Sequence, residues 1–213
     1  MPDLNWHTTE PLLQAILKDL MAARSFDPFR LVGGTALALQ LGHRISVDID
    51  LFTDRLYGSL DFDAIDAWMR QQYLYVSEPT PGPVGMGRSY FVGNSPQEAI
   101  KLDIYYTDAF IQPPLILEQL RMATIEEIIA MKMDVIQRRG RKKDYWDIHA
   151  LLHRYAIQQM IDLHEQRYPY GHDPARIRHN LNDFTYADED FDPICLRNER
   201  WQFIKLDLIA ANT

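Results

Sequence analysis

The residues with the clearest chemical meaning are two aspartates and a preceding pair of glycines. Gly33 and Gly34 end a short apolar stretch, Thr35 follows them, and Asp48 and Asp50 come later with one residue between them. Glycines let the backbone approach a phosphate group, and the helix expected after them offers free N–H groups. Carboxylates hold Mg²⁺ together with phosphate oxygens, and moving a nucleotide needs mainly positioning and neutralisation of charge. The combination predicts metal-dependent nucleotide transfer.

The stretch from Arg44 to Phe52 alternates between polar and aliphatic residues. If it is a strand, Arg44, Ser46 and the two aspartates line one face, and four aliphatic side chains enter the core. Aspartate has a low strand propensity, and like charges on one face repel each other, so a cation between the carboxylates would explain them. A solvated strand face has the same alternation, and a tight turn without a ligand would also explain the glycines.

A third carboxylate, Asp103, lies in the middle of a predicted strand over 98–106, which we expect to pair in antiparallel fashion with 88–93. Together with Asp48 and Asp50 it would complete a set of metal ligands. Two metal ions about 3.5–4 Å apart could then hold the attacking and leaving oxygens.

Lys132 falls in the apolar stripe of a predicted helix that Thr124 caps and that runs to about 139. Burying an unpaired ammonium group is costly, so Lys132 needs a carboxylate or a phosphate nearby, unless its chain extends to solvent. Asp144, on the inner side of the next predicted helix, is its natural partner, although it could equally cap that helix. Asp147 lies at the edge of the same stripe and ranks below Asp144.

A basic cluster separates these two helices, and it is a candidate contact for RNA or triphosphate, or else a solvated turn: Arg138, Arg139, Arg141, Lys142 and Lys143. His149 and His153 are one turn apart, but no acidic third ligand accompanies them. Cys195 is the only cysteine and is most simply a core residue, so the chain has no internal disulfide, which fits a reduced, cytoplasmic setting.

The composition limits the class of partner. The 213 residues carry a formal net charge of −8, which makes general coating of nucleic acid a poor hypothesis. No apolar run is long enough to span a membrane, so we expect no membrane partner.

The remaining elements follow from periodicity and from the positions of proline and glycine. We expect helices over 8–24, 35–42, 61–72, 157–167 and 198–210, strands over 29–32 and 73–77, and a turn or mobile loop over 79–87. Pro113 and Pro114 mark a change of character. We therefore expect a core domain over 1–112 and a mainly helical lobe over 113–213.

Four segments together resemble a known family: GGTALAL from Gly33, RISVDIDLF from Arg44, KLDI from Lys101, and Lys132 followed by RKKDYWD from Arg141. They resemble the AbiEii/AbiGii nucleotidyltransferase-like toxins of the DNA-polymerase-beta-type superfamily, over roughly residues 30–155. The resemblance implies an α+β nucleotidyltransferase fold, with a small mixed β-sheet flanked by helices and a helical C-terminal lobe.

The resemblance also implies a function. It points to a cytoplasmic bacterial protein that uses a nucleoside triphosphate with Mg²⁺ or Mn²⁺ and is often paired with an antitoxin. Some members add nucleotides to the acceptor end of tRNA. We therefore expect a toxin that moves a nucleoside monophosphate to an acceptor hydroxyl on tRNA or another RNA. Two alternatives stay open: a nucleotide-binding or protein-docking module with little catalysis, and a transferase that modifies protein.

The site predicted in this way has three overlapping parts. The catalytic residues are Asp48, Asp50, Lys132 and Asp144. The nucleotide-binding residues are Gly33, Gly34, Thr35, Arg44, Ser46 and Lys132, and the metal ligands are Asp48, Asp50 and Asp103. The superfamily motif has Gly-Ser where this chain has Gly33–Gly34, so a hydroxyl on the phosphate would come from Thr35 or be missing. Members differ in their use of the third carboxylate, here Asp103.

Overall fold

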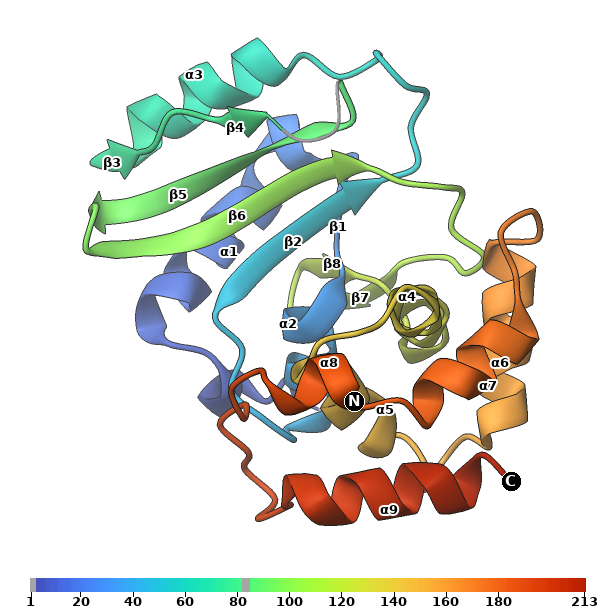
Figure 1. The fold of residues 1–213 in the computed structure, drawn as a ribbon. Helices are drawn as coiled ribbons and strands as arrows, with labels where there is room; N and C mark the ends of the chain where they lie inside the picture. The colour runs from blue at the N-terminus through green and yellow to red at the C-terminus, as the bar shows by residue number, and fades with distance from the viewer. Residues whose placement is uncertain (1–2, 82–84) are drawn as a thin grey trace.

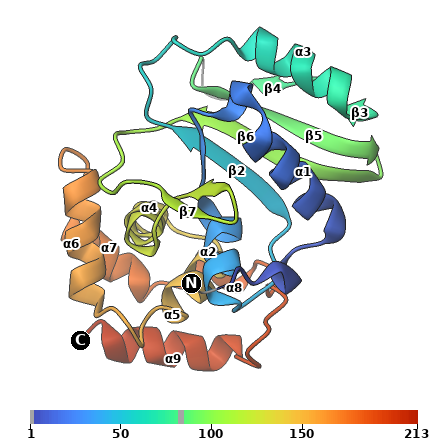
Figure 2. The ribbon, with the colours of Figure 1, turned by 180° about the vertical axis from the view of Figure 1, so that it is seen from behind.

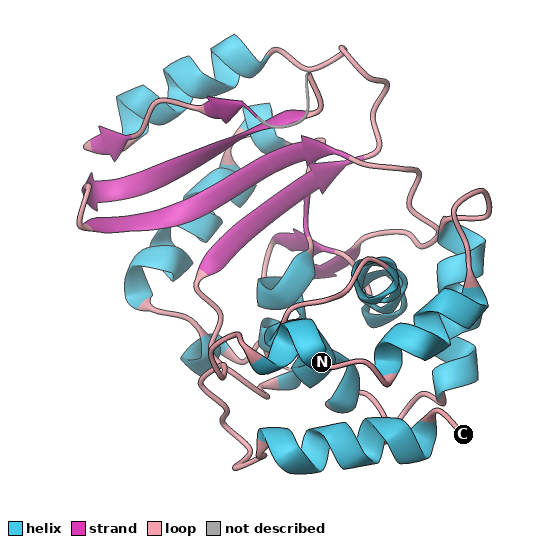
Figure 3. Cartoon of the chain, in the orientation of Figure 1, coloured by secondary structure: helices cyan, strands magenta, loops and turns pink. Residues whose placement is uncertain are grey.

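The computed structural model describes residues 3–81 and 85–213. Among these residues, eight strands form one mixed sheet with helices around it, which confirms the predicted α+β class (Figures 1 and 3). Seven strands follow one another in the order β3-β5-β6-β2-β1-β8-β7, and β4 pairs with β5. The strands are β1 (Arg30–Leu31), β2 (Asp48–Thr53), β3 (Tyr75–Val76), β4 (Thr80–Pro81), β5 (Gly87–Ser95), β6 (Glu98–Tyr106), β7 (Leu115–Leu117) and β8 (Leu120–Met122).

Strand β2 lies at the centre of the sheet and pairs with β6 in parallel and with β1 in antiparallel fashion. Its residues alternate as the sequence predicts, with Ile49 and Leu51 fully buried. The register places Asp50 directly opposite Asp103 on β6. The central pairing therefore brings together two carboxylates that are far apart in the sequence.

The helices cover the sheet unevenly. Helix α1 (Pro11–Ala22) packs behind it, and α3 (Phe62–Gln72) lies beside β3 (Figure 2). Helix α2 (Gly33–Leu41) follows β1 directly and packs against α4 and α5. The other helices gather at one end of the sheet: α4 (Ile125–Gln137), α5 (Lys142–His149), α6 (Ile157–Arg167), α7 (Pro174–Leu181), α8 (Thr185–Asp188) and α9 (Trp201–Ala211).

The predicted strand over Arg44–Phe52 is wrong in its first half. Strand β2 begins at Asp48, and Val47, which was expected in the core, has 55% of its surface exposed. The preceding residues pair with the segment before α9: Ile45 N–H donates to Ile194 O at 2.9 Å, and Arg44 forms a bridge with Cys195. A neighbour from the far end of the chain replaces the expected strand partner.

The sheet continues past the proline pair at 113–114. Strands β7 and β8 form a hairpin, and β8 pairs with β1 in parallel at Leu31 and Met122. The sequence predicts mainly helix beyond the proline pair, so this hairpin differs from the prediction. The division into domains over 1–112 and 113–213 stays a prediction, but the sheet itself extends beyond residue 112.

Other differences are small. Strand β4 and the start of β5 occupy part of the predicted loop over 79–87, whose residues 82–84 lie outside the described residues. The predicted helix over 8–24 is shorter and ends at Ala22. Helices α7 and α8 lie in the region where the sequence showed no clear pattern.

Candidate active site

The turn between β1 and α2 requires glycine for two reasons. Gly33 has a φ of +67°, in the left-handed region that residues with a side chain rarely adopt. A Cβ atom at Gly33 would lie 2.5 Å from Asp50 Oδ2, and a Cβ at Gly34 would collide with the guanidinium group of Arg44. The turn thus lies directly against the carboxylate of Asp50, with the N-terminus of α2 beside it.

Two hydroxyl groups support this turn from within. The Thr35 hydroxyl donates to the carbonyl oxygen of Asp48 and shares a 2.8 Å hydrogen bond with the Ser46 hydroxyl. Both side chains are buried. Thr35 and Ser46 therefore fix the turn to the start of β2, and a direct nucleotide contact by either hydroxyl stays a prediction.

Three carboxylates crowd together beside the turn. Burial and the neighbouring Asp103 and Asp48 raise the pKa of Asp50 to about 6. Lys101 forms an ion pair with Asp103 Oδ2, whereas the buried Oδ1 of Asp103 has no hydrogen-bond partner among the described residues. Lys143 Nζ lies 3.6 Å from Asp48 Oδ2. Lys101 and Lys143 therefore balance the charges of Asp103 and Asp48, and the negative charge of Asp50 is not balanced by an ion pair of its own.

This donor set fits a divalent cation only with help from a substrate. Within residues 3–81 and 85–213, no three His, Cys, Asp or Glu side chains are grouped so as to hold a metal ion. The unpartnered oxygen of Asp103 and the raised pKa of Asp50 are both features that a cation would relieve. Because Mg²⁺ in nucleotide-handling sites takes one or two carboxylates and completes its shell with phosphates and water, Asp48, Asp50 and Asp103 are suitable ligands.

Lys132 is buried, as the stripe on α4 suggested, and it is paired. Its ammonium group lies 2.6 Å from Asp144 Oδ1 and 2.7 Å from Asp147 Oδ2, and these carboxylates raise its pKa despite its burial. Asp144 also accepts a 2.9 Å hydrogen bond from Arg141 N–H at the start of α5. The two roles considered for Asp144, ion pair and cap, are therefore both present.

Asp147, which the sequence reading ranked below Asp144, is the centre of the buried charge network. Its carboxylate is fully buried and accepts two hydrogen bonds from Arg44, from Nε at 2.6 Å and from Nη2 at 2.9 Å. His43 Nε2 lies 2.8 Å from the same carboxylate. Arg44 and Lys132 keep the pKa of Asp147 well below its ordinary range. Asp144 and Asp147 lie three residues apart and so share one face of α5, and this spacing could have indicated in the sequence that both contact Lys132.

A pocket of about 700 Å³ opens between the sheet and α4. Five of the predicted residues line it: Gly33, Gly34, Asp50, Lys132 and Asp144. Lys143, from the predicted basic cluster, lines it as well. Arg44, Ser46, Thr35, Asp48 and Asp103 are not among its lining residues and lie beside or beneath it.

Several apolar and aromatic side chains line this pocket. Phe52 and Tyr106 come from the sheet, Met131 and Val135 from α4, and Tyr168 from the end of α6. Such side chains can stack on or pack against a flat aromatic group. Tyr168 could not be predicted as a pocket residue from the sequence, because nothing local connects it with the sheet.

The basic cluster over 138–143 is largely paired. Arg141 forms two hydrogen bonds with Asp190, and Lys142 lies 2.9 Å from Asp192. Arg138 pairs with Asp134 one turn earlier on α4. The cluster is therefore partly neutralised by acidic residues, and Lys143 has the longest contact among these pairs.

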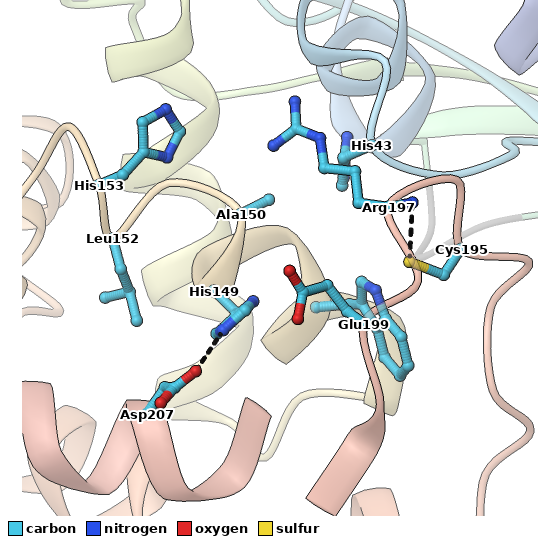
Figure 4. A pocket seen from close by; sticks show the side chains of 10 residues that line it. His43, His149, Ala150, Leu152, His153, Cys195, Arg197, Glu199 and Asp207 are labelled. Carbon is cyan, nitrogen blue, oxygen red and sulfur yellow. Dashed lines mark hydrogen bonds and ion pairs between the residues drawn. The ribbon is translucent and has the colours of Figure 1, made fainter. Parts of the chain in front are cut away.

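A separate pocket of about 450 Å³ lies between His43, the end of α5 and the segment before α9 (Figure 4). His149 Nε2 lies 2.9 Å from Asp207 Oδ2, and Cys195 Sγ accepts a hydrogen bond from Arg197 N–H at 3.3 Å. His43 touches both this pocket and Asp147. Cys195 is only partly buried, at the pocket edge rather than deep in the core.

This fold, with a glycine turn against strand carboxylates and a pocket beneath a lysine-bearing helix, is that of a nucleotidyltransferase. The chain belongs to the family of AbiEii nucleotidyl transferase toxins of type IV toxin–antitoxin systems, which it matches over residues 15–212. It is thus a nucleotidyltransferase, and the resemblance noted in the sequence is confirmed.

Individual proteins resemble this chain in sequence or in fold. An uncharacterized protein of Aquifex aeolicus (strain VF5) is 30% identical in an alignment of 154 positions that covers 67% of this chain and 67% of the other. JHP933 from Helicobacter pylori has a TM-score of 0.61 at 21% identity, covering 94% of this chain and 87% of the other. MenT4, a nucleotidyltransferase toxin from Mycobacterium tuberculosis H37Rv, has a TM-score of 0.55 at 16% identity, covering 94% and 82%. These two structural likenesses concern the fold.

Proposed function

We propose that this protein transfers a nucleoside monophosphate from a nucleoside triphosphate to a hydroxyl group of RNA, such as tRNA, in a reaction that depends on Mg²⁺ or Mn²⁺. The observation that carries the proposal is the pairing of Asp50 with Asp103, directly beside the Gly33–Gly34 turn and the 700 Å³ pocket. Carboxylates crowded to this degree are costly unless positive charge and phosphates meet there.

The chain's own residues suggest a division of labour. Backbone N–H groups at the start of α2 would bind the triphosphate, since that turn lies open to the pocket. Lys143 would balance negative charge beside Asp48, and Lys132, held by Asp144 and Asp147, would present a fixed ammonium group to the nucleotide. Because Lys132 is already oriented, little reorganisation accompanies substrate binding.

Asp48, Asp50 and Asp103 would hold the metal ion together with phosphate oxygens. A bound divalent cation would supply charge neutralisation at the α-phosphate and would lower the pKa of the acceptor hydroxyl. Arg44 acts indirectly in this scheme, because its guanidinium group packs against Gly34 and holds Asp147 in place.

The direct test is transfer of label. The purified protein is incubated with Mg²⁺, each α-labelled nucleoside triphosphate in turn, and total RNA. We expect label in RNA with the wild type, and none with Asp50→Asn or with excess EDTA. Asp63→Asn is the matched control, because Asp63 is largely exposed on α3, and it should retain wild-type activity.

The other outcomes separate the alternatives. Tight binding of a triphosphate without transfer would favour a nucleotide-binding or docking module. Label in a protein band would favour a transferase acting on protein. Full activity of Asp50→Asn would contradict the metal role. The family assignment also implies a cognate antitoxin, and coexpression of the neighbouring gene should relieve any growth arrest that the protein causes.

A further inference from the structure

A second, smaller pocket lies on the other side of the aspartate pair. Its volume is about 290 Å³, and Asp48 lines it, whereas Asp50 lines the larger pocket. Lys143 lines both pockets and so marks the boundary between them. The smaller pocket therefore reaches Asp48, but not Asp50 or Asp103, and adjoins the larger pocket at Lys143.

The outer wall of this pocket is the segment over 190–194, between α8 and α9, which runs beside the residues that lead into β2 (Figure 1). Asp190 accepts hydrogen bonds from Arg141 at 3.0 and 3.1 Å, and Asp192 lies 2.9 Å from Lys142 Nζ. Backbone hydrogen bonds join Ile194 to Ile45 and Leu196 to His43, each at 2.9 Å. The wall is thus fixed to α5 and to the start of β2.

Three apolar side chains beside this pocket are exposed to solvent. Phe191 is 91% exposed, Ile194 68% and Val47 55%. The charged side chains that line the pocket balance in number, with three cations and three carboxylates: Arg44, Arg141, Lys143, Asp48, Asp190 and Asp192. Such a surface suits a flat, uncharged group with a hydroxyl better than it suits a long run of phosphates.

We propose that this pocket binds the unpaired terminal nucleoside of the acceptor RNA, with its base against Phe191 and its ribose hydroxyl directed toward Asp48. The inference rests on the proposed function, because it assigns the acceptor side of that reaction. Unpaired RNA ends are commonly recognised by stacking on aromatic side chains, and a pocket of this volume has room for about one nucleoside.

The chemistry requires an acceptor hydroxyl close to the α-phosphate. The hydroxyl oxygen forms a bond to the α-phosphorus, the bond from that phosphorus to the bridging oxygen breaks, and pyrophosphate leaves while the hydroxyl proton passes to solvent. Attacking and leaving oxygens lie roughly in line. With the triphosphate in the larger pocket at Asp50, an acceptor in the smaller pocket would lie next to it, because Lys143 lines both pockets.

The test compares Phe191→Ala with Phe203→Ala, whose side chain is 50% exposed on α9. With an RNA that has an unpaired 3′ end, we expect Phe191→Ala to raise the KM for RNA about tenfold, as the loss of one stacked base does, with an unchanged KM for the triphosphate. Phe203→Ala should behave as the wild type. Removal of an exposed ring leaves the fold intact in both variants.

A second measurement does not depend on turnover. The same RNA with 4-thiouridine at its 3′ end should crosslink on irradiation to the peptide that contains Phe191. RNA affinity should also depend weakly on salt, with a logarithmic slope of about −1 to −2, because few cations line the pocket.

The outcomes distinguish the two proposals. If the wild type labels RNA but Phe191→Ala has an unchanged KM for RNA, or the crosslink lies elsewhere, the acceptor site is wrong while the function stands. If the wild type labels a protein and no RNA, both are overturned.

Discussion

Asp50 carries a carboxyl group that the fold keeps from ionising readily. Below about pH 4 this carboxyl group is mainly protonated in both the folded and the unfolded chain, so its ionisation does not lower the free energy of unfolding. Because its folded pKa is raised to about 6, stability is lost as the pH rises from about 4 through 6. At pH 8 this loss can reach about 3 kcal/mol, from the 1.36 kcal/mol that accompanies each pKa unit.

Asp50→Asn should therefore stabilise the metal-free protein by about 1–3 kcal/mol at pH 8 and have little effect at pH 4. Urea unfolding in EDTA at the two pH values measures the difference. Addition of Mg²⁺ with a triphosphate should stabilise the wild type more than the variant. An equal effect of the substitution at both pH values would contradict the crowding of carboxylates.

Asp147 has the opposite character, since its folded pKa is well below the ordinary value. Its contribution to stability is present above about pH 4 and is lost only as the pH falls further. Asp147→Asn leaves Arg44 and Lys132 without their shared carboxylate, and we expect a loss of about 3–5 kcal/mol at pH 7.

Asp144→Asn is the matched comparison on the same helix. Lys132 would keep Asp147, so we expect a smaller loss of about 1–2 kcal/mol. Both values come from urea unfolding at pH 7. A larger loss for Asp144→Asn would mean that Asp147 is not the centre of the network.

At the scale of elements, the turn between β1 and α2 can be tested with a glycine that has the same backbone but no close neighbour. Gly33 and Gly58 both have positive φ, at +67° and +79°, but nothing lies within 4 Å of a Cβ atom at Gly58. Gly58→Ala should cost about 1 kcal/mol from backbone strain alone. Gly33→Ala should cost more and abolish transfer, because its methyl group displaces Asp50.

Thermal unfolding and the RNA-labelling assay together measure this pair of variants. Gly58→Ala should retain wild-type transfer. If the two variants lose equal stability and both keep activity, the close approach of the turn to Asp50 has no functional meaning.

Local patterns predicted some elements and failed for others for identifiable reasons. The stripe on α4 and the cap at Thr124 depend on residues close in sequence, so Lys132 and Asp144 could be placed before the structure was known. The start of β2 could not, because Ile45 pairs with Ile194 and no local pattern records that contact. Strand β8 was missed because three residues are too few for a period, and its partner β1 is distant in sequence.

The same distinction applies to the site. Gly33, Asp48 and Asp50 were found because a glycine pair at a strand-to-helix turn is followed by two aspartates, which are depleted in strands, on one strand face. Asp147 was ranked too low, and Tyr168 and Phe191 were not singled out, because their surroundings come from what the fold places next to them. The contribution of the segment over 190–194 to the pocket beside Asp48 follows from tertiary pairing alone.

At the scale of the whole molecule, the sheet and the helical part share one core. Buried residues of α2, β2, α4, α5 and α9 belong to one continuous hydrophobic cluster. Arg167 on α6 pairs with the buried Glu127 on α4 and donates to Thr107 Oγ1 at 2.9 Å, beyond the end of β6. Glu127 in turn accepts from the N–H groups of Ile111 and Gln112.

We therefore expect the chain to unfold in one transition. Hydrogen exchange followed by mass spectrometry across a urea series should show peptides from β2, β6 and α9 losing protection at the same urea concentration. Arg167→Ala should lower that concentration for all of them, at a cost of about 3–5 kcal/mol. Earlier loss of protection in α9 would instead support separate domains on either side of residue 112.

The pairing of Ile45 with Ile194 has a consequence for the time at which activity can appear. The pocket beside Asp48 needs the segment over 190–194, and Asp147 on α5 must reach back to Arg44. A nascent chain on the ribosome therefore lacks this pocket until residues 190–194 have emerged. Fragments released early from the ribosome would be inactive, and catalytic activity would begin only after synthesis of these late segments.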